Sequence, residues 1–382
     1  MIDHSRTKSL QMVDLRTQHQ RISKEVEDAV QEVIGSAAFI NGPAVRQFAE
    51  SLGEYVESPF VIPCGNGTDA LQIAMMGLGL EPGDEVLVPA FTYVATAEVI
   101  ALLGLRPVFV DVEADTFNIN LEEAANKISE KTKAIVPVHL FGQCANMQGL
   151  LDLADAHDLH IIEDAAQSLG AEYIFPGDNR KKAGTIGTIG ITSFFPSKNL
   201  GCYGDGGALF THNPKIAGQL KSISNHGQSQ KYHHDRVGVN SRLDSLQAAI
   251  LKVKLRYLDE YCQRRNWAAQ LYRQQLQHLE DIQLPERKPY STHVYNQFTI
   301  RVSSEVRDDL RTFLKEQGIP TMLYYPKPLH LQKAYHIYGF QEDDFPVAES
   351  LCSEVLSLPM HTELEEDEIS FICEQINHFF YE

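Results

Sequence analysis

Hydrophobic and polar residues follow two alternating patterns along most of this chain, one typical of buried strands and one of amphipathic helices. Short apolar runs bounded by glycine, proline or charged residues predict strands that are covered on both faces. Apolar residues spaced three and four apart predict the helices between them. We expect strands at 60–63, 85–89, 107–112, 134–140, 160–162 and 207–211, and a further apolar run at 189–196. We expect helices at 20–35, 45–56, 70–80, 92–103, 121–129, 147–157 and 213–224.

The repeated order of strand and helix predicts the fold class α/β, with a largely parallel sheet between two layers of helices. In such sheets, ligands bind beyond the carboxyl ends of the strands. The turn at 65–68, the segment 91–93, Asp164 and Lys198 all lie at or near such ends. The residues with the most promising chemistry are therefore expected at one edge of the sheet.

The pattern changes after residue 224. Residues 225–242 are polar and predict a loop, and 243–279 predict a long helical stretch. Beyond it we expect strands at 294–302 and 321–325 and helices at 304–317, 345–357 and 364–380. The chain thus divides into a large domain, 1–260, and a small α+β domain, 261–382, with the boundary inside the long helix near residue 260. Residues 1–18 are polar and predict an arm lying on another surface.

Composition and charge narrow the classes of partner. The 382 residues are 43% hydrophobic and 22% charged, which is typical of a globular protein with room for two domains. The formal net charge of −18 repels nucleic acid and anionic membranes. No apolar run approaches the roughly 20 residues of a membrane span, and the first residues, MIDHSRTKSL, show no apolar core of a signal peptide. The six cysteines include no CxxC pair, so we expect reduced thiols and a cytoplasmic location.

Lys198 follows the apolar run 189–196 and precedes a turn dense in glycine. Burial lowers the pKa of an amine because its charged form loses water. A neutral amine attacks a carbonyl and forms a Schiff base. A lone lysine in this setting is more often a solvated loop residue. Whether Lys198 is a catalytic lysine therefore depends on the residues found with it.

Two further features suit an anionic cofactor. The strand at 60–63 leads through a glycine turn into a helix, and free amides at a helix N-terminus bind phosphate. Asp164 ends an apolar strand, where a carboxylate needs a cationic partner. Helix capping by Asn66 or Thr68 explains the turn equally well, and an ion pair with Lys198 explains Asp164 equally well.

Pyridoxal phosphate accounts for these features together. It needs a lysine for the Schiff base, an acid at its pyridine nitrogen, a phosphate cradle, a stacking side chain and a group near its phenolic oxygen. The sequence offers candidates for all five roles in Lys198, Asp164, Gly67 and Thr68 with Ser193, Tyr93, and Gln167.

Six motifs extend this picture through most of the chain. They are CGNGTDAL (64–71), PAFTYVATAE (89–98), EDAAQSLGA (163–171), SFFPSKNLGCYGDGGA (193–208), YHHDRVGVNSRLDSLQAAIL (232–251) and YYPKPLH (324–330). In these motifs and their order, the chain closely resembles the pyridoxal-phosphate-dependent sugar-nucleotide aminotransferases of the DegT type. This resemblance implies fold type I, the fold of aspartate aminotransferase, with a mostly parallel mixed sheet and a small C-terminal α+β domain.

The resemblance also implies roles for individual residues. It implies a Schiff base on Lys198 with Asp164 at the pyridine nitrogen, and a homodimer whose active sites are shared across the interface. Asn240 then reaches the phosphate of the neighbouring subunit. The residues expected on the substrate side are Tyr232, His234, Arg242 and Tyr325. For Tyr325 simple packing is an alternative, because aromatic residues before proline often only pack.

The resemblance leaves open which sugar nucleotide is the substrate and which of its carbons is aminated. The motifs look most like enzymes that aminate C3 of UDP-2-acetamido-2-deoxy-3-oxo-glucuronate with L-glutamate, for surface polysaccharide (O-antigen) synthesis. The alternative is a C4 aminotransferase of a UDP- or dTDP-4-keto-6-deoxy sugar. A uronate favours a cationic pocket, for which Lys231, Arg236 and Arg242 are candidates if they do not lie on a solvated loop.

Other activities have less support. Related dehydratases replace the lysine by histidine, and a regulatory protein without turnover would need a DNA-reading extension that the sequence does not suggest. We also expect no metal site, because the spacing of His226, His233 and His234 matches no zinc pattern. Asp69 and Asp205 are expected to be cap and turn residues.

Overall fold

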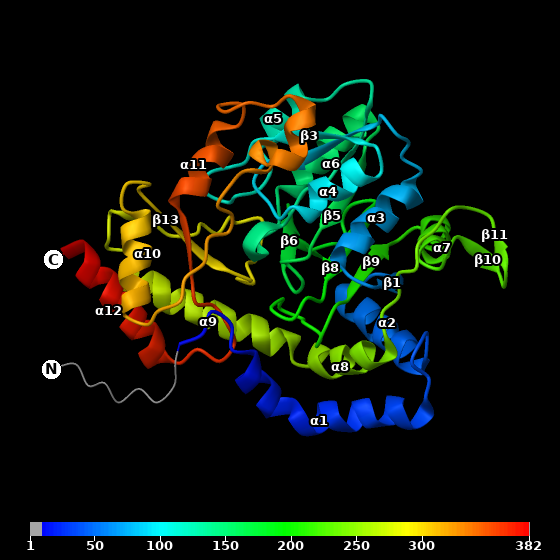
Figure 1. Cartoon of the computed structure of the whole chain (residues 1–382), viewed down its shortest axis with the longest axis horizontal. Helices are drawn as coiled ribbons and strands as arrows, with labels where there is room; N and C mark the ends of the chain where they lie inside the picture. The colour runs from blue at the N-terminus through cyan, green and yellow to red at the C-terminus, as the bar shows by residue number, and fades with distance from the viewer. Residues whose placement is uncertain (1–9, 382) are drawn as a thin grey trace.

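A computed structural model describes residues 10–381 and is built around a seven-stranded sheet (Figure 1). Six strands run parallel to one another, while β9 is antiparallel to both of its neighbours, β1 and β8. The prediction of a mostly parallel mixed α/β sheet is therefore confirmed. The strands stand in the order β1 (Phe60–Cys64), β9 (Gly207–Thr211), β8 (Ile189–Ser193), β5 (His160–Asp164), β4 (Thr132–Ile135), β2 (Glu85–Pro89) and β3 (Arg106–Val110).

Helices cover both faces of the sheet, and each layer has its own apolar core. The first face packs against α3 (Gly67–Leu78), α4 (Ala95–Leu102) and α7 (Pro214–Ile223). The second packs against α2 (Pro43–Val56), α5 (Leu121–Asn126), α6 (Met147–His157) and α8 (Ser245–Leu255). Strand residues alternate between these two cores, as in Ile161 and Ile162, which explains why the strands read as continuous apolar runs.

The register of the sheet gathers the ends of three strands at one edge. Gly207, the first residue of β9, is paired with Cys64 at the end of β1 and with Ser193 at the end of β8. Asp164, at the end of β5, is paired with Ile191 of β8. The turn after β1, the acid that ends β5 and the segment leading to Lys198 therefore meet at the carboxyl edge, as expected for an α/β sheet.

The C-terminal part contains a second, three-stranded sheet, β12 (Ile282–Gln283), β13 (Phe298–Val302) and β14 (Val355–Leu358). It packs with α9 (Leu258–Leu276), α10 (Arg307–Glu316) and α12 (Glu366–Tyr381) into a third core, the small domain at the left of Figure 1. The segment with η2 (Leu329–Leu331), η3 (Lys333–Tyr338) and α11 (Pro346–Glu354) instead packs in part on the core of the large sheet. The division near residue 260 stays a prediction.

Several predicted elements need correction. No strand forms at 321–325, where only Met322 bridges Ser357, and the helix expected at 345–357 ends at Glu354 because the next residues form β14. The long helical stretch is two helices, α8 and α9. The expected loop at 225–242 contains a hairpin of β10 (Gln228–Gln230) and β11 (His233–His234) that projects at the right of Figure 1.

Other differences are smaller. β4 ends at Ile135, well before the expected residue 140, and a 3₁₀ turn, η1, spans Leu140–Gly142. A hairpin of β6 (Glu172–Phe175) and β7 (Asn179–Lys182) was not expected. Of the predicted polar arm, 1–9 lie outside the described residues, and α1 (Leu15–Ser36) begins before the arm was expected to end. Among the described helices, none is both long and apolar enough to cross a bilayer.

Candidate active site

Lys198 lies just beyond β8 in a tight turn whose backbone closes with a 2.9 Å hydrogen bond from its own amide to the carbonyl of Phe195. Burial lowers the pKa of its amine from 10.5 to about 8, and the Asp164 carboxylate opposes this shift. Within residues 10–381, its ammonium group makes no hydrogen bond and no ion pair at contact distance. The side chain is therefore a largely buried amine, partly neutral near pH 7, rather than a solvated loop lysine.

Asp164 is buried at the end of β5 and is held by two hydrogen bonds. Its Oδ1 accepts from the amide of Ala166 at 3.1 Å, and its Oδ2 accepts from the hydroxyl of Thr96 at 3.0 Å. Burial raises the pKa of the carboxyl, while these two bonds and nearby Lys198 lower it. Thr96 was not among the predicted site residues, although its lone hydroxyl among the apolar residues 94–97, at the start of α4, could have indicated it.

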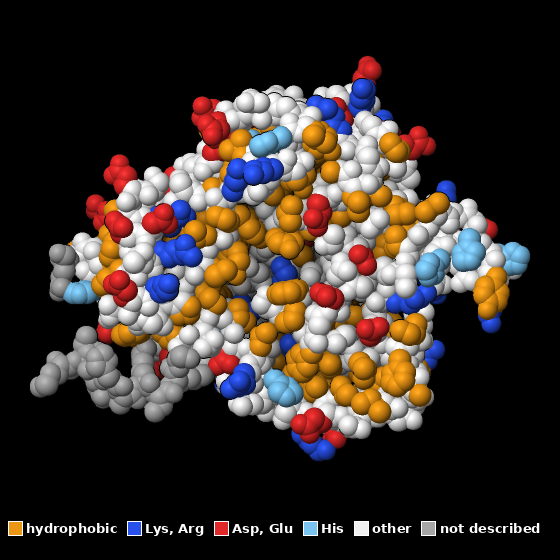
Figure 2. Space-filling view, in the orientation of Figure 1, with side chains coloured by type: hydrophobic (Ala, Val, Ile, Leu, Met, Phe, Trp, Pro, Cys, Tyr) orange, Lys and Arg blue, Asp and Glu red, His pale blue; other side chains and the backbone are white. Residues whose placement is uncertain are grey.

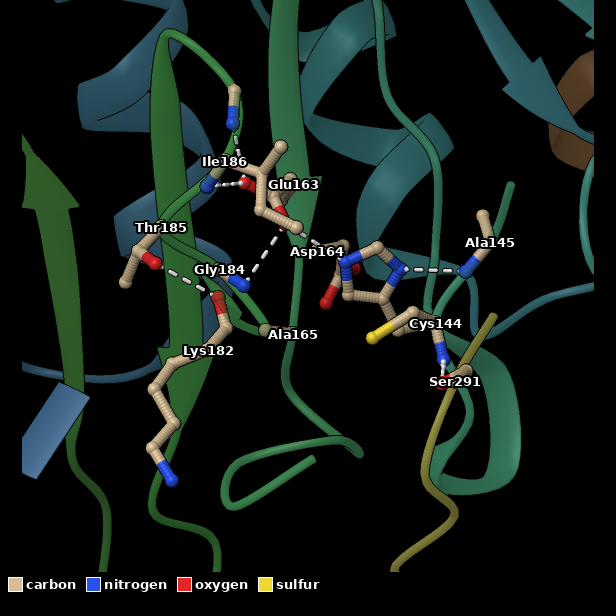
Figure 3. Close-up of polar contacts among 12 residues, drawn as sticks. Cys144, Ala145, Glu163, Asp164, Ala165, Lys182, Gly184, Thr185, Ile186 and Ser291 are labelled. Atoms are coloured by element: carbon tan, nitrogen blue, oxygen red, sulfur yellow. Dashed lines mark hydrogen bonds and ion pairs between the residues drawn. The ribbon is translucent and has the colours of Figure 1, made fainter. Parts of the chain in front are cut away.

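Glu163 lies beside Asp164 in β5 but points to the opposite face of the sheet, where it forms a buried polar cluster (Figure 3). Its carboxylate accepts from the amides of Ile186 and Gly187, each at 2.5 Å, and from the amide of Gly184 at 2.9 Å. The Nε2 of buried His139 lies 3.0 Å from the same carboxylate. Nδ1 of His139 accepts from the amide of Ala145 at 3.1 Å, so the proton of a neutral ring is on Nε2.

The His139–Glu163 pair is tied to the strand that carries Asp164. The amide of His139 donates to the carbonyl of Asp164 at 3.0 Å, and the Asp164 amide donates to the carbonyl of Pro137 at 2.9 Å. The pair thus fixes the end of β5 from its far side. Sequence reasoning missed both residues, because only the fold brings a histidine after β4 against a glutamate in β5.

The turn after β1 leaves backbone amides free at the start of α3, a geometry that suits an anion, and we call it the anion-binding turn. The side chain of Asn66 caps the helix by accepting from the amide of Asp69 at 2.8 Å. The amides of Gly67 and Thr68 donate to no acceptor within the described part of the chain, and therefore remain available. A Cβ on Gly67 would lie 2.8 Å from Cβ of Ser193, so only glycine fits where the two strand ends meet.

The three remaining predicted residues of this edge form a second group. The amide oxygen of Gln167 accepts from the amide of Phe141 at 2.8 Å, and its Nε2 donates to the hydroxyl of Tyr325 at 3.1 Å. The rings of Tyr325 and Tyr93 have centroids 6.2 Å apart, and the side chain of Tyr93 is 57% exposed. Tyr325 therefore contacts predicted site residues and does more than pack.

Asn240 and Arg242 lie at the base of the hairpin and contact each other, because Nη1 of Arg242 donates to Oδ1 of Asn240. Ser241 between them connects this segment to the anion-binding turn: its hydroxyl accepts from the amide of Gly65 at 2.9 Å and donates to Asp69 at 2.6 Å. Asp69 itself lies in the first turn of α3.

His234 is placed differently from the other predicted site residues. Its Nδ1 contacts the carbonyl of His226 at 2.9 Å within the projecting hairpin. In the described chain no contact joins it to Lys198 or Asp164. No group of three or more histidine, cysteine or acidic residues is arranged to hold a metal ion among residues 10–381.

The residues present fit pyridoxal phosphate. Two free amides at the start of α3 and the nearby Ser193 suit the phosphate group. The buried carboxylate of Asp164 lies near the amine of Lys198, which forms no ion pair. Gly67 leaves the space that a side chain would fill. Fold and site together define a class, the pyridoxal-phosphate-dependent transferases of the aspartate aminotransferase type.

Comparison with known proteins places the chain within this class. It belongs to the DegT/DnrJ/EryC1/StrS aminotransferase family, whose model matches residues 20–377. It is 43% identical to a pleiotropic regulatory protein of Geobacillus stearothermophilus, over 97% of this chain and 98% of that protein. It is 42% identical to the UDP-2-acetamido-2-deoxy-3-oxo-D-glucuronate aminotransferase of Pseudomonas aeruginosa, over 95% and 98%. A 39% identical relative, over 96% and 94%, is the dTDP-3-amino-3,4,6-trideoxy-alpha-D-glucose transaminase of Streptomyces venezuelae.

Solved structures agree with this assignment. DesV of S. venezuelae, solved in complex with a ketimine intermediate, superposes with a TM-score of 0.94 at 38% identity, covering 98% of this chain and 100% of DesV. A Bacillus subtilis protein solved with bound pyridoxamine phosphate gives a TM-score of 0.88 at 32% identity, over 97% and 83%. The protein is therefore an aminotransferase that uses pyridoxal phosphate.

Proposed function

We propose that this enzyme transfers the amino group of L-glutamate to C3 of UDP-2-acetamido-2-deoxy-3-oxo-glucuronate. The observation that carries the proposal is a largely buried Lys198 that forms no ion pair, lies near buried Asp164 and stands beside the turn at the start of α3. The related enzymes of P. aeruginosa and S. venezuelae are both named for amino transfer to nucleotide-linked sugars. The product would enter the synthesis of a surface polysaccharide such as an O-antigen.

The proposed chemistry assigns one task to each residue. Pyridoxal phosphate supplies the electron sink that stabilises the carbanion left when a proton leaves the carbon bearing the amino group. Lys198 would hold the cofactor covalently at rest, and its amine, when free, would move the proton as general base and acid. The carboxylate of Asp164 would keep the pyridine nitrogen protonated, and the free amides of Gly67 and Thr68 with Ser193 would bind the phosphate. Gln167 and Tyr325, joined by their hydrogen bond, would hold the phenolic oxygen, and Tyr93 would bind the ring.

A C3 keto group is favoured over a C4 keto group by the names of the relatives. The P. aeruginosa enzyme is named for a 3-oxo sugar, and the S. venezuelae enzyme for a 3-amino sugar. One name carries UDP and the other dTDP, so the names do not decide the nucleotide. The alternative to be tested is a C4 aminotransferase of a UDP- or dTDP-4-keto-6-deoxy sugar.

Arg242 is our candidate for the carboxylate of a uronate. Its guanidinium contacts the amide oxygens of Asn240 and Asn225, the latter at 3.0 Å, and forms no ion pair with any described carboxylate. Its Nε is buried without a hydrogen-bond partner. A half-buried guanidinium that no described carboxylate neutralises favours an anionic group on the substrate.

We further propose a homodimer with shared sites, working in the cytoplasm. The hairpin that carries His234 projects from the body, and Tyr232 at its tip and Val237 beyond β11 are 80% and 84% exposed. Such exposed apolar side chains favour contact with a second subunit, in which Asn240 would reach the phosphate and His234 the substrate. All six cysteines are free and buried, which agrees with a reducing compartment.

The test is to incubate the pyridoxal phosphate holoenzyme with L-glutamate and a panel of UDP- and dTDP-linked 3-keto and 4-keto sugars, and then to measure the masses of the products by mass spectrometry. We expect the mass change of amination with the UDP 3-keto uronate, and none with the Lys198→Ala variant. Amination of a 4-keto-6-deoxy sugar instead would replace the proposed substrate. Loss of water would indicate a dehydratase, and no turnover of glutamate would support a regulatory role.

A further inference from the structure

Asn199, the residue after Lys198, carries a buried side-chain amide that is bonded to a distant part of the chain. The residue is 4% exposed, and its Nδ2 donates to the carbonyl of Val294 at 3.1 Å and lies 3.8 Å from Sγ of Cys262 in α9. The orientation of this amide follows from its partner, because the flipped amide would set its oxygen against the carbonyl oxygen of Val294. Lys198 is therefore joined to residue 294 through its immediate neighbour.

Val294 belongs to a buried segment, 293–296, that we call the crossing segment because it leads from the large domain into β13 of the small domain. Each of its residues is buried. Just before it, the amide of Thr292 donates to the carbonyl of Glu172 in β6 at 2.9 Å, and β13 begins shortly after it, at Phe298. The crossing segment contains no helix and no regular strand, so its backbone groups need partners elsewhere.

The carbonyls of the crossing segment accept hydrogen bonds from side chains of two sources. Most of them accept from α9: His293 from Asn266 at 2.8 Å, and Tyr295 and Asn296 from Arg265 at 3.1 and 3.2 Å. The carbonyl of Val294 accepts from Asn199 instead. Within residues 10–381, Asn199 alone bonds a carbonyl of the crossing segment to the turn that carries Lys198.

The opposite side of the crossing segment is bonded to η1, which also contacts Gln167. The amide of Val294 donates to the carbonyl of Gly142 at 2.9 Å. The amide of Phe141, the preceding residue of η1, donates to Oε1 of Gln167 at 2.8 Å. One continuous series of hydrogen bonds therefore runs from Asn199 through the crossing segment and η1 to Gln167.

The surroundings of this series make its polar contacts specific. On the face drawn in Figure 2, apolar side chains gather between the small domain at the left and the large sheet. A buried carbonyl that loses its donor in such surroundings is costly, since no other polar group replaces the donor. The bond from Asn199 to Val294 therefore restricts where the turn that carries Lys198 can lie.

We propose that Asn199 is a positioning residue for Lys198, because it bonds the turn that carries the lysine to the crossing segment and so holds it in place relative to Gln167. The backbone bond from Lys198 to Phe195 fixes the shape of this turn, but not its place relative to Gln167. The inference rests on the role of Lys198 in the proposed function, in which Lys198 and Gln167 act on the same cofactor.

The experiment compares Asn199→Ala with a matched control, Asn266→Ala, which removes the 2.8 Å bond to the neighbouring carbonyl of His293 but lies on α9. Stopped-flow absorbance follows the uptake of pyridoxal phosphate by the apoenzyme and then the half-reaction with glutamate, without any sugar. We expect both rates to fall about tenfold in Asn199→Ala, with less than about a twofold change in the half-saturating glutamate concentration. The control should keep both rates within about twofold.

Urea denaturation of both variants separates positioning from stability, and we expect similar midpoints for the two. Should Asn199→Ala not fold, Asn199→Ser replaces it, because a hydroxyl arm is shorter than the amide arm and does not restore the bond. Equal losses of rate in the Asn199 and Asn266 variants, or unchanged rates in a folded Asn199 variant, would overturn the inference.

A Lys198→Ala variant distinguishes failure of this inference from failure of the proposed function. If that variant still forms the visible absorption band of a bound Schiff base, the proposed role of Lys198 is wrong, and the inference about Asn199 is lost with it. If Lys198→Ala abolishes the band while Asn199→Ala behaves like Asn266→Ala, only the positioning role of Asn199 is refuted.

Discussion

The hydroxyl of Thr96 donates a 3.0 Å hydrogen bond to Oδ2 of Asp164, and both side chains are buried. This bond opposes the rise in the Asp164 pKa that burial causes. We predict that Thr96→Val lowers kcat/KM for the nucleotide sugar about tenfold, because one lost buried hydrogen bond to a charged group is worth about 1.5 kcal/mol. Thr96→Ser keeps the hydroxyl and should restore most activity. Equal rates for the two variants would contradict the role of the bond.

Lys198 and Lys254 form a natural pair for testing covalent chemistry, because burial lowers the pKa of each to about 8. The ammonium of Lys254 is occupied, since it donates to the carbonyl of Gly201 at 2.5 Å. We predict that Lys198→Ala abolishes the visible absorption of the bound Schiff base and lowers turnover by at least about 10³-fold. Lys254→Met should keep the absorption band. Loss of the band in the Lys254 variant alone would reverse the assignment.

The lowered pKa of Lys198 predicts how cofactor loading depends on pH. Only the neutral amine attacks the carbonyl, and with a pKa of about 8 roughly one-tenth of it is neutral at pH 7. The rate at which the apoenzyme takes up pyridoxal phosphate should therefore rise about tenfold from pH 7 to a plateau above pH 9. Stopped-flow absorbance measures it, with N-acetyl-lysine as the reference. A rise that continues to pH 10.5, as in the reference amine, would show that burial does not tune Lys198.

Glu163 is expected to act on stability rather than on catalysis. Its carboxylate is surrounded by donors, three backbone amides and the ring of His139 (Figure 3). An amide in its place turns an –NH₂ group toward one of these donors, so we predict that Glu163→Gln lowers the free energy of unfolding by about 2–4 kcal/mol. Urea denaturation measures the loss. Glu130→Gln, at an exposed position, should leave the midpoint unchanged, and a similar shift in both variants would contradict the prediction.

Tyr325 and its neighbour Tyr324 allow a matched test of the contact with Gln167. Only the hydroxyl of Tyr325 accepts from Gln167, at 3.1 Å. Tyr325→Phe leaves a mostly buried amide without this partner, so we predict a fall in kcat of about five- to tenfold, equivalent to about 1 kcal/mol. Tyr324→Phe should change kcat by less than about twofold. Steady-state kinetics with both substrates would distinguish them.

Much of the secondary structure of the large domain could be predicted from the sequence. The strands at 85–89 and 207–211 and the helix at 147–157 were predicted to the residue. In buried strands and amphipathic helices, the spacing of apolar residues along the sequence itself indicates which positions are buried. The C-terminal part was less readable. Val355–Leu358 continues an apolar helix pattern, and only pairing with β13 makes it a strand.

The amino-acid sequence by itself predicted the cofactor and the fold, because Lys198, Asp164 and the turn at Gly67 form an ordered set within motifs that run through most of the chain. The tertiary structure alone decided which side chains tune that chemistry. Thr96 and His139 contact residues that are distant in the chain, so no spacing in the sequence reveals them. Their contacts depend on the order and register of strands in the sheet, which arise only when the whole chain packs.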